Sequence, residues 1–121
     1  MNRTRMLAAA GVAALATGVV AASAGAATSG GTLNAAVSDP LNISLKQGGK
    51  KVTTLPHGVY TITVKDTAAD HNFHIIGPGL NKLTSVAGKS TTSWKVTLRK
   101  GTYRFQCDPH ASFMKGSFKV T

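Results

Sequence analysis

Three side chains of metal-binding type stand close together near the C-terminus of this 121-residue chain. Cys107, His110 and Met114 bring a thiol, an imidazole and a thioether into eight residues, and the chain has no other cysteine. Sulfur donors combined with imidazole favour copper, and two histidines with one cysteine and a weak axial methionine form the trigonal copper site of electron-transfer proteins. The segment therefore predicts part of a copper site, which needs a second histidine from elsewhere in the chain.

Two histidines upstream, His71 and His74, are candidates for that position. If the segment around them is extended, His71 shares one face with the apolar Phe73 and Ile75, whereas His74 shares the other face with Asn72. Because Phe73 and Ile75 are expected to face the core, we favour His71 as the inward-pointing ligand. His74 stays open as the alternative, since a β-bulge would reverse the alternation.

The segments that must position these residues have the pattern of β-strands. Apolar and polar residues alternate with period two in short runs separated by Gly, Pro, Asn and Asp, and no window has a helical apolar stripe. The clearest runs are residues 60–65, 93–98, 103–107 and 118–120. Residues 28–36 are expected to form a flexible lead-in and a weak first strand. Strands of this length with one wet face predict an all-β fold, a Greek-key β-sandwich or small barrel.

The same alternation predicts where the C-terminal candidates point. Cys107 has the parity of Tyr103 and Phe105, so it should end a strand facing the core, where a thiolate is shielded from water. Met114 has the parity of Phe118 in the next strand. We therefore expect Cys107 and Met114 at the two ends of a hairpin loop that carries His110 between them.

A short pattern, L-x-x-G-x-Y, occurs twice, at residues 55–60 and 98–103. The glycine permits a tight corner, and the tyrosine hydroxyl can bind nearby backbone as in a tyrosine corner. We interpret both copies as structural. His57, inside the first copy, is expected to be a surface histidine.

The N-terminus has the features of a secretory signal peptide. Arg3 and Arg5 precede a charge-free run over residues 6–22, and small residues with two alternative A-x-A cleavage patterns follow. We take residues 1–26 as the signal and residues 27–121 as one mature domain. An uncleaved anchor is the alternative, but it needs about 20 strongly apolar residues, and this run is mostly alanine and glycine. The expected location is the periplasm, the cell envelope or the exterior, without a membrane span after cleavage.

The mature domain is strongly basic. Loss of Arg3 and Arg5 leaves 12 of the 14 basic residues against 4 acidic ones, a formal charge of +8. This charge favours an acidic protein partner or a polyanionic surface, or it is simply a solvated basic face. Export and the scattered lysines argue against nucleic acid. We expect a monomer.

A lone cysteine in an oxidising compartment needs protection, because it cannot form an internal disulfide. Ligation to a metal and burial as an inert apolar side chain would both provide it.

The four acids are all aspartates, and no carboxylate pair or Ser/His/Asp set indicates catalysis. The sequence therefore predicts that the chain is not an enzyme.

Cys107-Asp-Pro-His110 followed by Met114, with His71-Asn72 upstream and a final strand after Gly116, resembles the cupredoxins of the plastocyanin, pseudoazurin and amicyanin type. The resemblance covers the whole mature domain. It implies one type 1 copper bound by His71, Cys107, His110 and Met114, with Asn72 tying the ligand loop to the neighbouring strand. It also implies one-electron transfer between protein partners, with His110 at the exposed edge of the site.

Three alternatives use the same residues differently. The chain could carry or store copper outside the cytoplasm with the same ligands. It could be a metal-free β-sandwich surface domain in which Cys107 is buried and inert. A zinc site from His71, His74, Cys107 and His110 is also chemically allowed, but it would leave Met114 without a role.

Overall fold

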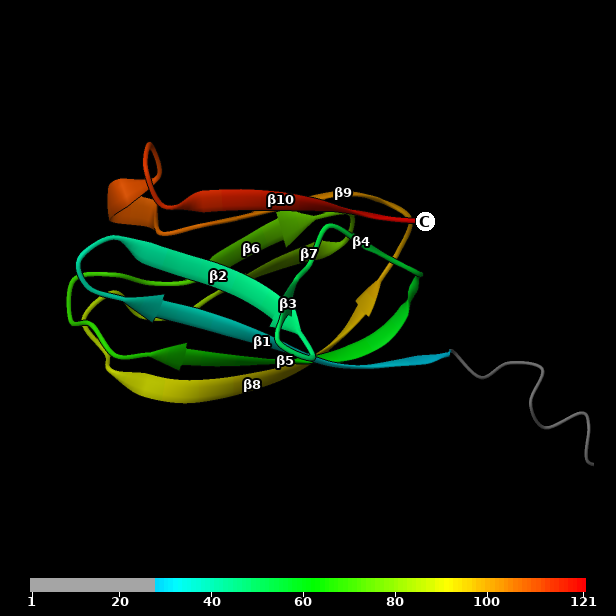
Figure 1. Cartoon of the computed structure of the whole chain (residues 1–121), viewed down its shortest axis with the longest axis horizontal. Coiled ribbons are helices and arrows are strands. Elements are labelled where there is room, and N and C mark those ends of the chain that lie inside the picture. Colours follow the sequence, from blue (N-terminus) through cyan, green and yellow to red (C-terminus); the bar gives the residue numbers. More distant parts are fainter. Residues whose placement is uncertain (1–27) are drawn as a thin grey trace, which may run out of the picture.

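Two five-stranded β-sheets pack face to face in the computed structural model, which describes residues 28–121 (Figure 1). The predicted all-β sandwich is therefore confirmed, whereas the predicted signal peptide lies outside the described residues. The strands are β1 (Ser29–Ser38), β2 (Asn42–Gln47), β3 (Lys50–Lys51), β4 (Thr54–Leu55), β5 (Gly58–Asp66), β6 (His74–Gly77), β7 (Leu80–Leu83), β8 (Ser90–Leu98), β9 (Gly101–Gln106) and β10 (Lys115–Val120). Within residues 28–121, no helix has the length and apolar character required to cross a membrane.

The first sheet has the strand order β3-β2-β1-β5-β8, and the second has the order β4-β10-β9-β6-β7. Most neighbours are antiparallel, but β1 pairs with β5 and β10 pairs with β4 in parallel. Because β9 and β10 belong to one sheet and are joined by the segment 107–114, the candidate ligands Cys107 and Met114 are held at adjacent strand ends.

The first strand differs from its prediction. Residues 28–36 do not form a lead-in to a weak strand, because β1 lies in the middle of its sheet between β2 and β5. Its Leu33, Ala35 and Val37 alternate into the core and are almost completely buried. Because alanine is small, this segment looks only weakly hydrophobic in the sequence. The strand forms nevertheless, because its backbone pairs with a neighbouring strand on each edge.

The core follows the predicted alternation in the other strands. Tyr60, Ile62 and Val64 of β5 are buried, and Tyr103 and Phe105 of β9 face them from the opposite sheet. Aromatic stacking joins the elements of the second sheet, with ring centroids 5.5 Å apart for Phe73 and Phe105 and 5.3 Å apart for Tyr103 and Phe118.

Both L-x-x-G-x-Y segments form tyrosine corners, as predicted. The Tyr60 hydroxyl donates to the Pro56 carbonyl at 2.6 Å, and the Tyr103 hydroxyl donates to the Arg99 carbonyl and accepts from the Arg99 N–H, both at 2.8 Å. A Cβ on Gly77 would come within 2.1 Å of the Tyr103 ring, so only glycine fits beneath it. His57 is exposed, as expected. We call this end of the sandwich, which also holds the C-terminus, the corner end (Figure 1).

Candidate metal centre

Four connections meet at the other end of the sandwich, which we call the metal end (Figure 1). They are the turn between β1 and β2, the segment between β5 and β6, the segment between β7 and β8, and the loop between β9 and β10, which contains the short 3₁₀ helix η2 (Asp108–His110). These connections bring residues about 30 to 40 positions apart in the sequence into contact, for example His71 with both Pro40 and His110.

The loop between β9 and β10 is closed by its own backbone. The Cys107 N–H donates to the Met114 carbonyl at 3.0 Å, the His110 N–H donates to the Cys107 carbonyl at 3.0 Å, and the Met114 N–H donates to the His110 carbonyl at 2.8 Å. Pro109 lies in the first turn of η2, where a missing N–H costs no helical hydrogen bond. The positions of Cys107, His110 and Met114 are therefore fixed relative to one another by the loop itself.

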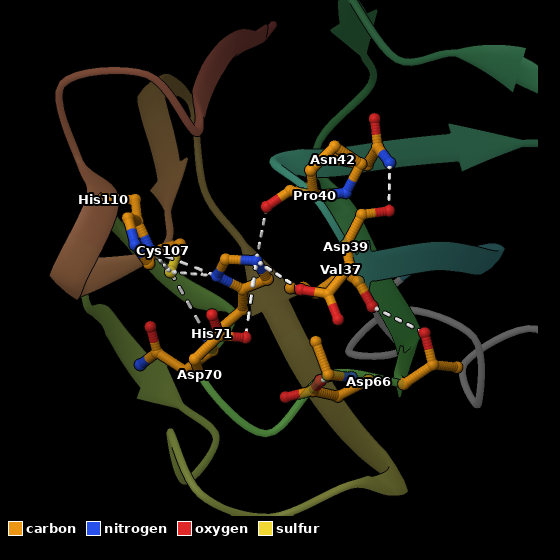
Figure 2. Close-up of polar contacts among 12 residues, drawn as sticks. Val37, Asp39, Pro40, Asn42, Asp66, Asp70, His71, Cys107 and His110 are labelled. Carbon is orange, nitrogen blue, oxygen red and sulfur yellow. Dashed lines mark hydrogen bonds and ion pairs between the residues drawn. The ribbon is translucent and has the colours of Figure 1, made fainter.

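The side chains of His71, Cys107 and His110 converge on one point (Figure 2). The Cys107 Sγ atom lies 3.7 Å from Nδ1 of His71 and 3.6 Å from Nδ1 of His110, and the two Nδ1 atoms are 3.1 Å apart. Cys107 and His71 are fully buried, and His110 is half-buried. The structure thus places His71, and not His74, with Cys107 and His110.

This triangle of donor atoms fits a single metal ion. Bonds of about 2.0 Å to imidazole nitrogen and about 2.3 Å to thiolate, as in zinc sites, separate two donors of one ion by about 3 to 4 Å at the usual bond angles. The three measured separations fall in that range. Two imidazoles and one thiolate are the donor set that selects copper in a trigonal site. The residues present therefore fit one copper ion.

Hydrogen bonds on the far side of the His71 ring determine which ring nitrogen faces Cys107 and His110. Its Nε2 lies 2.8 Å from the Pro40 carbonyl, which can only accept, so Nε2 is the donor, and in the neutral ring the lone pair is on Nδ1. The Asp39 carboxylate is 3.2 Å from the same Nε2 (Figure 2). A carbonyl and a carboxylate behind the ring orient it and make Nδ1 a better donor to a metal.

Asn72 ties the ligand loop to the neighbouring segment. Its side-chain amide donates to Asp108 Oδ2 at 3.0 Å and to the Thr84 carbonyl at 3.2 Å, and its Oδ1 accepts from the Asp108 N–H at 2.8 Å. The Asn72 backbone N–H points at Cys107 Sγ at 3.4 Å. The predicted tie between Asn72 and the ligand loop is therefore present. The strand alternation that grouped Asn72 with His74 does not hold here, because residues 71–73 precede β6 and are all buried.

His74 belongs to a different cluster. Its Nδ1 lies 2.8 Å from Asp108 Oδ1 and its Nε2 lies 2.6 Å from Asn81 Oδ1. Since this ring is occupied by Asp108 and Asn81, the four-donor zinc set that includes His74 is not assembled.

Asp108 is the centre of that cluster. Burial alone would raise the pKa of Asp108, but hydrogen bonds from Gln106, His74 and Asn72 outweigh it, and the pKa of this carboxyl lies below its ordinary value. The carboxylate therefore stays ionised at neutral pH and holds η2 against β6 and β9.

Met114 and several exposed apolar side chains also lie at this end. Met114 is fully buried and lies beside Cys107 across the β9–β10 ladder, with its side chain in the core cluster. Three large apolar side chains are exposed on the connections at this end, Phe113 at 76%, Leu41 at 46% and Val86 at 37%. The metal end thus combines buried donors with exposed apolar side chains, and we call Phe113 and Leu41 its apolar rim.

Sequence reasoning missed the residues that support the ligands from a distance. Pro40 and Asp39 behind His71, and Thr84 beside Asn72, carry no local motif. The one available signal was an aspartate adjacent to a candidate ligand at two places, Asp70 before His71 and Asp108 after Cys107, and each contacts a histidine.

The sequence and the structure of the chain are similar to those of known proteins. Residues 26–121 match the family described as copper binding proteins, plastocyanin/azurin family. The NMR structure of reduced rusticyanin is 22% identical, with 82% of this chain and 84% of rusticyanin covered and a TM-score of 0.57. Rusticyanin from Thiobacillus ferrooxidans is 22% identical, with 76% and 78% covered and a TM-score of 0.54. Auracyanin from Roseiflexus castenholzii is 26% identical, with 80% and 99% covered and a TM-score of 0.49. No curated protein sequence matched.

The structural matches support the cupredoxin-like fold, and the family match spans every described residue. The His–Cys–His triangle supplies the donors that copper requires. The chain is therefore a type 1 copper protein and belongs to the plastocyanin/azurin family of copper-binding proteins.

Proposed function

We propose that the chain transfers single electrons between partner proteins, using one copper ion held by His71, Cys107, His110 and Met114. The observation that carries this proposal is the convergence of two imidazole Nδ1 atoms and one buried thiol within 3.1 to 3.7 Å of one another. Copper bound there supplies a one-electron couple. Met114, buried at the adjacent strand end, is the proposed axial ligand.

The protein's own contribution is a fixed donor arrangement. His71 is held from behind by Pro40, and Cys107 and His110 are held by the backbone bonds of their loop. A site whose ligands cannot move far changes little when it gains or loses an electron, which favours rapid transfer. The same rigidity disfavours a carrier that must release its metal.

His110 is the proposed point of electron exit. Its ring is half-buried, its Nδ1 lies 3.6 Å from Sγ of the buried Cys107, and the exposed Phe113 of the apolar rim donates its N–H to the His110 carbonyl. A partner that covers this rim would bury apolar surface next to the loop that carries His110. Because such a site only passes electrons, we propose that the chain is not an enzyme.

Charge and export define the proposed setting. With residues 1–26 as a signal peptide, the protein acts in the periplasm, at the cell envelope or outside the cell. The formal charge of +8 on the remaining residues, 12 basic minus 4 acidic, favours an acidic redox partner and makes association weaken with salt.

Titration of the purified protein with Cu(II), followed by visible absorption and electron spin resonance, tests the metal site. We expect one equivalent of copper, intense thiolate-to-copper absorption, and complete loss of that band in Cys107→Ser. His57→Ala, which removes a histidine at the corner end, is the matched control and should keep the full band. A band that survives in Cys107→Ser would refute the ligand assignment.

Redox cycling in the presence of a copper chelator separates electron transfer from copper carriage. We expect the protein to be reduced and reoxidised repeatedly with its copper retained. Transfer of the copper to the chelator within the first cycles would instead indicate a copper carrier that uses the same ligands.

A further inference from the structure

One flank of the sandwich is left open between the outer edges of β2 and β10. The short strand β3 pairs with β2 only at Lys46 and Gln47, and β4 pairs with β10 only at Lys119 and Val120. In the described part of the chain, residues 42–44 and 115–118 therefore have no strand partner on their outer sides. The two uncovered edges face each other, one from each sheet.

A cavity of about 500 Å³ lies between these edges. We call it the flank cleft and define it by its lining residues. Its apolar wall consists of Ile43, Leu45 and Phe105, and its cationic side chains are those of Lys46, Lys51 and Lys115. A smaller cavity of about 320 Å³ adjoins it and is lined by Arg104 and again Lys115.

The charge in the flank cleft is uncompensated. No lysine or arginine of residues 28–121 lies within ion-pair distance of a carboxylate, since each ion pair joins an aspartate to a histidine. None of the four aspartates lines either cavity. Lysine ammonium groups gathered around an apolar wall attract an anion that also carries apolar groups.

We propose that the flank cleft binds an extended acidic segment of a partner protein. Unpaired strand edges offer N–H and C=O groups at the spacing of an extended peptide, which a phosphate chain does not match. In such a segment alternate side chains point to opposite sides, so apolar residues can contact the partly exposed Ile43 while acidic residues meet the lysines. Charge and backbone pairing therefore select the same occupant.

The cleft lies beside the metal end. Lys115 directly follows Met114, and Ile43 is the second residue of β2, just after the turn that contains Pro40. A partner held in the cleft would thus have its adjacent surface next to the rim around His110. This inference deepens the proposed electron transfer to an acidic partner and rests on it for its physiological meaning, but peptide binding can be measured independently.

The test uses copper(I)-loaded, isotope-labelled protein and a capped hexapeptide in which aspartate alternates with valine. We expect amide shifts at residues 43–46 and 115–117, weaker binding at higher salt, and about tenfold weaker binding when Lys46, Lys51 and Lys115 are all changed to Gln. The matched control changes Lys65, Lys82 and Lys95 to Gln, which removes the same charge from exposed positions outside both cavities. This control should bind as the native protein does.

Three outcomes would overturn the proposal. They are equal weakening in both triple variants, shifts that map away from the flank cleft, and binding of inorganic polyphosphate at these residues without binding of the peptide. The visible spectrum of the copper(II) form of each sample reports separately on the copper site. If the peptide does not bind in the flank cleft, the electron-transfer proposal is unaffected. If the copper spectrum is not that of a type 1 site, the peptide-binding result can still be interpreted.

Discussion

The metal end and the corner end of the sandwich are both held by polar side chains buried among apolar ones, but the shortest hydrogen bonds of these side chains span very different distances along the chain. At the corner end, Tyr60 and Tyr103 bind carbonyls four positions away. At the metal end, Asn72 binds Asp108, 36 positions away, and His71 binds the Pro40 carbonyl, 31 positions away. The two tyrosine hydroxyls thus close local corners, and it is backbone bonds, such as that from the His57 N–H to the Thr121 carbonyl, that join this end to the C-terminus. At the metal end, by contrast, the side chains of Asn72 and His71 hold separate connections against one another.

This difference predicts that changes at the two ends have separable effects. A polar group removed from the corner end should lower the stability of the fold and leave the copper spectrum unchanged. A polar group removed from the metal end should change both stability and copper retention, because the same bonds hold the ligands in place.

Asn72→Ala should have the largest effect on stability. It removes an acceptor for the Asp108 N–H and a donor to the Thr84 carbonyl in a fully buried place, at an expected cost of about 3 kcal/mol. We also expect severalfold faster copper loss to a chelator. Denaturant unfolding of the copper-free protein and the chelator assay measure the two effects, and Asn34→Ala, an exposed change in β1, is the control. Unchanged copper loss would show that the ligand loop does not need this tie.

Tyr103→Phe should cost about 1 to 2 kcal/mol of unfolding free energy, because the Arg99 N–H and carbonyl both lose their hydroxyl partner. Tyr60→Phe, which removes a single bond to Pro56, should cost less. Thermal and denaturant unfolding measure the difference between the two corners. The thiolate-to-copper band should be the same in both variants, and a shifted band in either would end the proposed separation of the two ends.

The same contrast explains what could be predicted from the sequence. Both tyrosine corners, the inward direction of Cys107 and the choice of His71 follow from spacing and alternation, which are local properties. The burial of Asn72 and the support of His71 by Pro40 could not be predicted, because they depend on which loops meet at the metal end. The central position of β1 was missed for a related reason, since its burial comes from pairing with β2 and β5 and not from strongly apolar residues of its own.

His74→Ala should have a smaller effect than either tyrosine change, less than about 1 kcal/mol, because its ion pair with Asp108 is partly exposed to solvent. The copper band should keep its full intensity, since His74 lies outside the triangle of donor atoms. Copper titration of the variant beside native protein checks this expectation. Loss of the band would return His74 to the set of candidate ligands.

Two aspartates at the metal end should respond to pH in opposite directions, which gives the finest test of how this end is built. Asp66, at the end of β5, is buried, and its Oδ1 accepts from the Ala68 N–H at 2.9 Å, whereas its Oδ2 has no partner within residues 28–121. Burial raises the pKa of Asp66. The pKa of Asp108 is lowered by the hydrogen bonds from Gln106, His74 and Asn72, which outweigh its own burial.

The signs follow from linkage. A carboxyl with a raised pKa stabilises the fold at low pH, and that contribution is lost as the pH rises through its folded pKa. A carboxyl with a lowered pKa stabilises the fold at higher pH, and that contribution is lost as the pH falls through its folded pKa. Relative to the native protein, Asp66→Asn should therefore become more stable as the pH rises, and Asp108→Asn should become less stable. Unfolding of the copper-free proteins across the carboxyl range measures both slopes, and parallel slopes would mean that the two environments do not differ as their hydrogen bonds indicate.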